Sequence, residues 1–410
     1  MKGNKRFKII MSIVLCVACM LFSVNRVDAA RTVSSECDIT DLNVPIDSSV
    51  TDAAIGQKLE INAKSAILLE PYTGEILYEM NSSEKLPPAS ITKIMSLLLI
   101  MEAIDKNTLS VEDVVTASEH ACSMGGSQIW LEPGESMTVD DLLKATVIAS
   151  ANDATVALGE QIAGSEEGFV AMMNEKAKEL GMDSTHFVNC TGLDAEGHLT
   201  TAHDVAIMSG ELIKYPLIKK YSTVWMDTLR DGESELVNTN KLVRFYEGTT
   251  GLKTGTTSGA GYCLSATASR NGTELVAVIM GGNTSNDRFN GAKKLLDYGF
   301  ANFTFKEIKP ELDENTYINV SDGVEKKVKV APKGGFSVLL KKSQSSELEQ
   351  KLNLKKNVSA PIKKGDVLGT VDIYSAGELV GAVKVYAQHD VDKISFRTVL
   401  KWIVAGLFVP

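Results

Sequence analysis

Histidine and cysteine, the residues that most often bind metal ions or cross-link small domains, are scarce in this sequence. Its 410 residues include six cysteines and five histidines. Cys16 and Cys19 lie in an apolar run near the N-terminus, and the other four cysteines are widely scattered. These residues show no metal-ligand spacing, and the cysteine density is far below that of a disulfide framework. We therefore expect neither a catalytic metal nor any other cofactor.

Basic patches are also missing from the body of the chain. The formal charge is −10, and it becomes −14 if residues 1–30, which hold five basic residues and one acidic residue, are removed. Binding to nucleic acid depends on clustered positive charge facing the phosphates. The composition therefore argues against a nucleic-acid partner.

Long apolar runs are rare, and the clearest one lies at the N-terminus. Four basic residues stand among the first eight, residues 9–24 are apolar, and Val27-Asp28-Ala29 has small residues where signal peptidase cleaves. This pattern is typical of a secretory signal peptide. We expect residues 1–30 to direct export and then to be removed, with an uncleaved membrane anchor as the alternative.

The C-terminal stretch is cationic, aromatic and apolar, with no acidic residue after Asp392. It is too short to span a bilayer comfortably, but its basic and apolar residues alternate at helical spacing. We expect residues 391–410 to form an amphipathic helix that lies on the membrane surface. The alternative is a helix docked on the protein's own core.

The chain between these ends predicts two domains after a polar lead, residues 31–60. Residues 66–70 and 75–79 predict a β-hairpin, residues 110–220 are mainly helical in pattern, and residues 261–268 and 274–280 predict a second hairpin before a closing helix. This order predicts an α+β domain, residues 61–302, in which helices pack on an antiparallel sheet. Short β-rich runs then predict a small all-β domain, residues 303–390, in which we find no chemistry.

The segment that carries chemistry begins at Pro87 and Pro88 and continues into a helix that is apolar on nearly all sides. Such a helix is buried, which makes Lys93 unusual, and Ser90 lies one turn before it on the same face. Burial lowers the pKa of an amine, so Lys93 is a candidate base for the Ser90 hydroxyl. The alternative is a helix-capping serine with a lysine that reaches solvent. Ser82 and Lys85 repeat the spacing in a polar loop, where the lysine would stay solvated.

Two further segments place polar groups where a cleft could form. Ser150 and Asn152 follow an apolar run, and a hydroxyl beside a carboxamide can relay protons and hold an amide. A helix cap is the alternative for this pair. Lys253, Thr254 and Gly255 precede the last hairpin, where glycine lets a substrate backbone approach a strand edge. The alternative is an edge strand protected from pairing by its lysine.

Taken together, Ser-x-x-Lys at 90–93, Ser-x-Asn at 150–152 and Lys-Thr-Gly at 253–255 resemble the motifs of serine β-lactamases and penicillin-binding proteins. The sequence is identified as similar to the low-molecular-mass penicillin-binding proteins, the serine-type D-alanyl-D-alanine carboxypeptidases. Gly126-Ser127-Gln128, the two-domain layout and the tail add to the resemblance, which covers nearly the whole chain. It implies the transpeptidase-like fold of that class, with a β domain behind it.

The resemblance also implies a mechanism on a peptidoglycan stem pentapeptide. Ser90 attacks the terminal D-Ala-D-Ala bond with Lys93 as general base, and backbone N–H groups of Ser90 and Thr256 form the oxyanion hole. Ser150 relays the proton to the leaving amine, and Asn152 holds Lys93 and the substrate amide. The terminal carboxylate is bound by Lys253, Thr254 and Thr256. β-Lactams are expected to acylate the same serine.

Two residues are left outside the predicted site. Some relatives place an arginine near the Lys-Thr-Gly strand, but Arg244, the nearest candidate, is not a secure counterpart. His198 is interpreted as a structural hydrogen-bonding residue. A β-lactamase, a non-catalytic sensor of β-lactams or peptidoglycan, and an endopeptidase or transpeptidase remain as alternatives.

Overall fold

The computed structural model describes residues 59–407 apart from 344, 346 and 347. The expected signal peptide and most of the polar lead, residues 31–60, lie outside the described residues. Within the described part, five antiparallel strands form one sheet in the order β2-β1-β9-β8-β7. The strands are β1 Ser65–Glu70, β2 Glu75–Met80, β7 Thr249–Thr257, β8 Gly261–Arg270 and β9 Thr273–Gly282. The order leaves β7 at an edge of the sheet.

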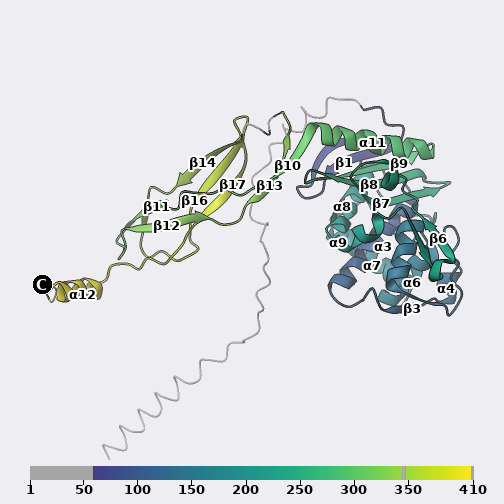
Figure 1. The fold of residues 1–410 in the computed structure, drawn as a ribbon, viewed down its shortest axis with the longest axis horizontal. Coiled ribbons are helices and arrows are strands. Elements are labelled where there is room, and N and C mark those ends of the chain that lie inside the picture. The colour runs from purple at the N-terminus through teal and green to yellow at the C-terminus, as the bar shows by residue number, and fades with distance from the viewer. Residues whose placement is uncertain (1–58, 344, 346–347, 408–410) are drawn as a thin grey trace, which may run out of the picture. The chain divides into compact units, whose positions relative to one another are not determined.

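Helices cover both faces of this sheet, which explains why its central strand β9 is buried along its whole length. Along β9, Val276 and Val278 pack into one core with helices α3 and α8, whereas Ala277 and Ile279 pack into another with α11. The alternation follows from the two-residue period of a strand. Figure 1 shows α11 on one side of the sheet and α8 on the other.

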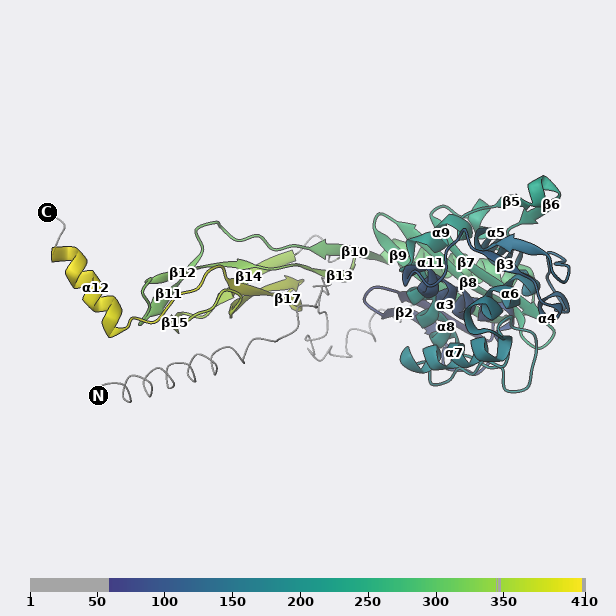
Figure 2. The ribbon, with the colours of Figure 1, turned by 90° about the horizontal axis from the view of Figure 1, so that it is seen from below.

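The helical region packs around α3, which lies among α6, α7 and α8 (Figure 2). Its residues from Lys93 to Met101 are all buried, as the sequence predicted for this helix. The helices are α3 Lys93–Asp105, α4 Glu119–Cys122, α5 Val139–Lys144, α6 Asn152–Ala163, α7 Glu166–Glu179, α8 Ala202–Ile213, α9 Pro216–Ser222, α10 Leu242–Phe245 and α11 Ser285–Asn302. Two short hairpins accompany them: β3 Val114–Thr116 with β4 Ser136–Thr138, and β5 Met226–Leu229 with β6 Ser234–Val237.

The second domain is all β, as predicted. It begins with β10 Phe303–Ile308, immediately after α11, and β10 pairs with β13 Phe336–Lys341. Six other described strands form a sheet in the order β14-β16-β17-β12-β11-β15, whose apolar side chains make a separate core. These strands are β11 Tyr317–Ser321, β12 Lys327–Pro332, β14 Leu348–Leu354, β15 Asn357–Ser359, β16 Val367–Ser375 and β17 Glu378–Ala387.

The expected terminal helix is present as α12, Phe396–Leu407, which begins at Phe396 rather than at residue 391; residues 408–410 lie outside the described residues. Its apolar side chains are exposed, Phe396 by 81% and Ile403 by 57%. Among the described residues, no helix has the length and hydropathy needed to cross a membrane.

Candidate active site

The nucleophile candidate lies in a 3₁₀ turn, Ala89–Thr92, that leads directly into α3. Ala89 adopts φ +51, a strained backbone for a residue with a side chain. Gly192 packs against this turn so closely that an added Cβ would lie 1.9 Å from the Ala89 carbonyl oxygen. The position of Ser90 is therefore fixed by the surrounding backbone as well as by its helix.

Lys93 is fully buried, and its amine is held by three oxygen atoms. Its Nζ donates hydrogen bonds to Asn152 Oδ1 at 2.5 Å, to the Thr191 carbonyl oxygen at 2.7 Å and to Ser90 Oγ at 3.2 Å. Burial lowers the pKa of Lys93 from its usual 10.5 to about 7. A lysine that reaches solvent is thereby excluded, and a large fraction of this amine is neutral at neutral pH.

Asn152 is oriented by backbone groups on the side away from Lys93. Its N–H donates to the Ser127 carbonyl at 2.7 Å, and its Nδ2 donates to the Gly125 carbonyl at 2.6 Å. The predicted Gly126-Ser127-Gln128 loop thus serves to fix the carboxamide oxygen toward Lys93.

Ser150 is not a helix N-cap. It follows a π-helical turn, Ala145–Ala149, and has φ +63, while α6 begins at Asn152 without a side-chain cap. Its Oγ is buried and has no hydrogen-bond partner among the described residues. A buried hydroxyl normally forms a hydrogen bond, so this one is available to a bound substrate.

The strand motif faces the nucleophile turn. An added Cβ on Gly255 would lie 2.9 Å from the Ser90 nitrogen, so glycine is needed for the close approach of β7. Lys253 is 1% exposed, which rules out the reading of a solvated lysine that protects an edge strand. Burial and repulsion from Lys93 and Arg288 hold the pKa of Lys253 well below its usual value. Thr254 is also buried, and Thr256 is exposed beside it.

Arg288, on α11, is a site residue that the sequence analysis missed. Its Nη1 donates to Thr256 Oγ1 at 2.9 Å and to the Gly255 carbonyl at 3.0 Å, and its buried Nε has no hydrogen-bond partner within the described residues. Arg244, which the sequence analysis left outside the predicted site, stacks its guanidinium on Trp225 and Phe245 instead. Arg288 lies 35 positions after Lys253 in the sequence, so only a helix packed on the sheet brings them together.

His198 is structural, as expected. Its Nδ1 accepts a hydrogen bond from the Val188 N–H at 2.9 Å, which leaves Nε2 to donate to Thr92 Oγ1 at 2.8 Å. Burial lowers the pKa of His198 to about 4, so the ring is neutral at neutral pH. The second Ser-x-x-Lys pair, Ser82 and Lys85, is excluded as a nucleophile and base. Ser82 Oγ donates a hydrogen bond to the Glu79 carboxylate at 2.6 Å, and Lys85 is exposed.

The seven predicted site residues lie on three segments of the α+β domain: Ser90 and Lys93, Ser150 and Asn152, and Lys253, Thr254 and Thr256. Hydrogen bonds join Ser90, Lys93 and Asn152, and Gly255 packs the third segment against the Ser90 turn. A serine beside a buried amine, faced by a lysine on a strand edge and an arginine on α11, is the arrangement expected of an acyl-transfer site that binds a terminal carboxylate.

Comparisons with known proteins agree with this class. The family model described as D-alanyl-D-alanine carboxypeptidase, peptidase family S11, matches residues 51–284, and the model for the C-terminal domain of penicillin-binding protein 5 matches residues 303–393. The chain belongs to the D-alanyl-D-alanine carboxypeptidases, a family of hydrolases that act on the cell wall.

Individual relatives resemble most of the chain. D-alanyl-D-alanine carboxypeptidase DacF of Bacillus subtilis is 45% identical over 348 residues, which cover 84% of this chain and 90% of the relative. DacC of Escherichia coli is 34% identical and covers 82% and 86%. The crystal structure of penicillin-binding protein 5 from Haemophilus influenzae superposes with a TM-score of 0.72 at 30% identity, covering 82% of this chain and 99% of that one.

Proposed function

We propose that this chain is a serine-type enzyme that removes the terminal D-alanine of peptidoglycan stem pentapeptides through an acyl-enzyme on Ser90. The observation that carries the proposal is the buried Lys93 amine, 3.2 Å from Ser90 Oγ with a pKa of about 7. A neutral amine at this distance can accept the hydroxyl proton as Ser90 attacks the carbonyl carbon.

The negative charge that develops on the carbonyl oxygen is stabilised by the backbone N–H groups of Ser90 and Thr256. The close packing of Gly255 against the Ser90 nitrogen supports this role, because it brings the strand and the nucleophile turn within contact distance. Ser150 then passes a proton to the leaving D-alanine nitrogen, a role supported by its unpartnered, buried hydroxyl. Asn152 holds the Lys93 amine and the substrate amide.

The terminal carboxylate of the substrate is bound by Lys253, Thr254 and Thr256. Arg288 adds a second cation on the far side of Thr256, where its Nη1 holds that hydroxyl. Two desolvated cations favour a carboxylate strongly, and this favours substrates that end in a free carboxyl group.

Water then hydrolyses the acyl-enzyme and releases a stem peptide shortened by one D-alanine. β-Lactams are proposed to acylate Ser90 in the same way. Support comes from penicillin-binding protein D2 of Listeria monocytogenes in its ampicillin-bound form, which superposes with a TM-score of 0.55 at 33% identity over 60% of this chain and all of that one.

We further propose that the protein is exported and held at the outer face of the cytoplasmic membrane by α12. In this helix Phe396, Val399, Leu400 and Ile403 follow a one-sided helical spacing and are exposed. Arg397 and Lys401 stand four residues apart between them, as in helices that lie at a membrane interface.

A purified protein that lacks residues 1–30 tests the activity. We expect it to release D-alanine from a peptide that ends in Lys-D-Ala-D-Ala, and we expect Ser90→Ala to abolish release. Ser82→Ala is the matched control, because it changes the serine of the second Ser-x-x-Lys pair and is expected to keep full activity. Release that survives in Ser90→Ala would exclude the assignment, and binding of β-lactam without any release would favour a sensor.

A further inference from the structure

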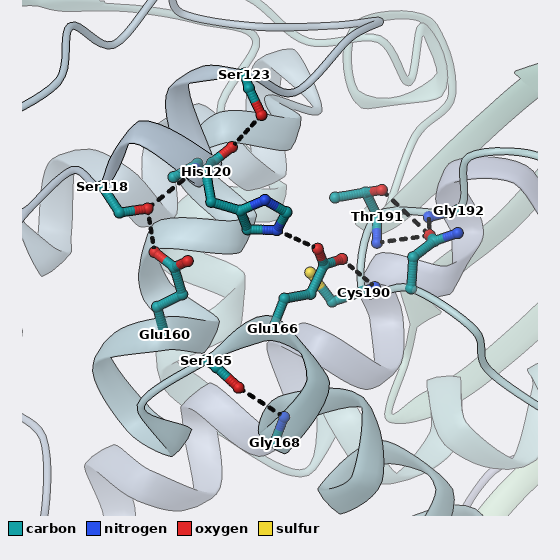
Figure 3. A network of polar contacts seen from close by, with 12 residues as sticks. Ser118, His120, Ser123, Glu160, Ser165, Glu166, Gly168, Cys190, Thr191 and Gly192 are labelled. Carbon is teal, nitrogen blue, oxygen red and sulfur yellow. Dashed lines mark hydrogen bonds and ion pairs between the residues drawn. The ribbon is translucent and has the colours of Figure 1, made fainter.

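Glu166 occupies the first turn of α7, and its side chain points toward His120 and Cys190 (Figure 3). One carboxylate oxygen accepts a hydrogen bond from His120 Nε2 at 2.7 Å, and the other accepts one from the Cys190 N–H at 3.1 Å. The neighbouring Glu167 also lies in this first turn, where the helix dipole stabilises an acidic side chain. Glu166 thus makes two specific contacts that its position at a helix start does not require.

The Cys190 peptide leads directly to the active site. Its carbonyl oxygen accepts a hydrogen bond from Ser96 Oγ at 2.7 Å, and Ser96 lies one helical turn after Lys93 on α3. The next carbonyl along the chain, that of Thr191, accepts the 2.7 Å hydrogen bond from Lys93 Nζ. Glu166 therefore anchors Cys190, the residue before Thr191, whose carbonyl holds the Lys93 amine.

The other side of this segment is also fixed. Asn189 Oδ1 accepts hydrogen bonds from the N–H groups of Thr191 at 3.2 Å and Gly192 at 2.7 Å. Gly192 in turn packs on Ala89, next to Ser90. With Asn189 on one side and Glu166 on the other, the Thr191 carbonyl has a defined direction in a segment without regular secondary structure.

We propose that Glu166 is a positioning residue for acyl transfer, which acts through the Cys190 peptide on the Thr191 carbonyl and so on Lys93, and that His120 holds the Glu166 carboxylate in place. The inference rests on the proposed role of Lys93. It assigns a function to a contact network outside the three motifs, reaching from the half-exposed ring of His120 to the buried amine.

The loss of this anchor has two consequences. The Lys93 amine is aligned less well on Ser90, so the acylation rate falls. Lys93 also loses part of its contact with the Thr191 oxygen, which stabilises the charged ammonium more than the neutral amine, so the pKa of Lys93 falls further. A change that merely unfolded some of the protein would lower the rate without moving the pH dependence.

The ionisable groups around the His120–Glu166 pair are Glu160 on α6, Glu167 on α7 and the Cys190 thiol, and those that face Lys93 are the Cys190 thiol, Asp153 on α6 and Lys253 on β7. The hydrogen bond to Glu166 raises the pKa of His120, and burial raises the pKa of the Cys190 thiol well above its ordinary value. Protonation of His120 could itself change the pH dependence of acylation, so its effect must be separated from the titration of Lys93. His120→Gln serves this purpose, since glutamine can still donate to Glu166 but does not titrate.

The experiment measures the acylation rate constant with a fluorescent penicillin from pH 5 to 9 on the full chain. For Glu166→Ala we expect the acylation rate constant at high pH, its plateau, to be about tenfold lower, as the loss of one well-placed hydrogen bond predicts. We also expect the acid limb, the pH range over which the rate constant rises to that plateau, to shift to lower pH. Glu166→Gln should restore both, because its amide can accept from Cys190 and pair with His120. Glu167→Ala, which removes the same charge from the same turn, and His120→Gln should leave the limb in place.

An acid limb in Glu166→Ala that coincides with that of Glu167→Ala would overturn the inference, whether or not the plateau falls. If Glu166→Ala does not fold, Glu166→Asp replaces it, because the shorter side chain cannot reach both His120 and Cys190. Its acid limb is then compared with that of Glu167→Ala in the same way. Failure of the proposed function is distinguishable, since the unaltered protein would then show no acid limb near pH 7 and Lys93→Ala would still acylate.

Discussion

Three basic side chains lie in or beside the site, and two of them are lysines that are almost wholly buried. Burial lowers the pKa of both amines. Lys93 can therefore accept a proton from Ser90, whereas Lys253 becomes charged when a bound carboxylate supplies the compensating negative charge. Arg288, whose pKa is lowered by burial, lies on the strand side with Lys253. A substrate carboxylate would supply the negative charge that this side lacks, as the proposed preference for a free C-terminus requires.

The pKa of Lys93 predicts how acylation depends on pH. The reactive form is the neutral amine, so the rate should rise with pH through about 7 and then level off. At one pH unit below the pKa, about a tenth of the amine is neutral, and the rate should be about tenfold below its plateau. Stopped-flow measurement of penicillin acylation checks this, with Lys93→Ala expected to lose a factor on the order of 10³ or more. A rate that does not change between pH 5 and 8 would contradict the general-base role.

His198 predicts an acid-sensitive stability. Its pKa is about 4 in the folded protein, below the ordinary 6.5, so the unfolded chain binds the proton more tightly. The free energy of unfolding should therefore fall as the pH drops from above 6.5 toward 4, by roughly 3 kcal/mol from this group. Urea unfolding at pH 7.5 and pH 4.5 measures it.

The matched comparison is between His198→Gln and His203→Gln. The first variant should lose this part of the pH dependence, while the second, which changes a partly exposed histidine of the same domain, should retain it. An unaltered pH slope in His198→Gln would show that the buried ring is not the source.

At the scale of elements, each motif is positioned by a different kind of backbone feature. A 3₁₀ turn with a strained alanine carries Ser90, a π-helical turn carries Ser150, and an edge strand carries Lys253. These irregular turns cannot be inferred from periodicity, because the sequence around Ser150 is compatible with an ordinary helix cap. The strands and helices that support them were predictable, since apolar runs in β9 and α3 are buried on all sides.

Elements with polar sequences were the ones that the sequence did not reveal. Strand β14 is largely exposed, and its sequence does not predict a strand, because its charged and amide side chains lack an apolar alternation. The hairpin of β5 and β6 was missed for the same reason. In both cases pairing with a neighbour, rather than burial, defines the strand.

The terminal helix predicts membrane attachment that can be removed without loss of chemistry. Deleting residues 393–410 should release active protein from membranes, because the apolar side of α12 is then absent while the site is unchanged. Cell fractionation followed by labelling with a fluorescent penicillin measures both properties. Replacing Arg397 and Lys401 by glutamine tests the contribution of charge, and truncated protein that stays with the lipid would refute the anchor.

For the molecule as a whole, the site could be predicted because three short motifs had to meet on one sheet edge. What could not be predicted were partners supplied by backbone groups or by distant helices. The Thr191 carbonyl carries no sequence signal, Glu166 reads as an ordinary acidic residue at a helix start, and Arg288 lies on a helix far from its strand in sequence. All three depend on packing that only the folded chain provides.

The most direct test of the account is a time course of intact mass after addition of benzylpenicillin, followed by peptide mapping of the adduct. We expect one adduct on the peptide that contains Ser90, its slow loss as the acyl-enzyme is hydrolysed, and no adduct in Ser90→Ala. Ser82→Ala should behave like the unaltered protein. An adduct on another residue, or one that forms in Ser90→Ala, would contradict the central claim that Ser90, activated by Lys93, is the nucleophile.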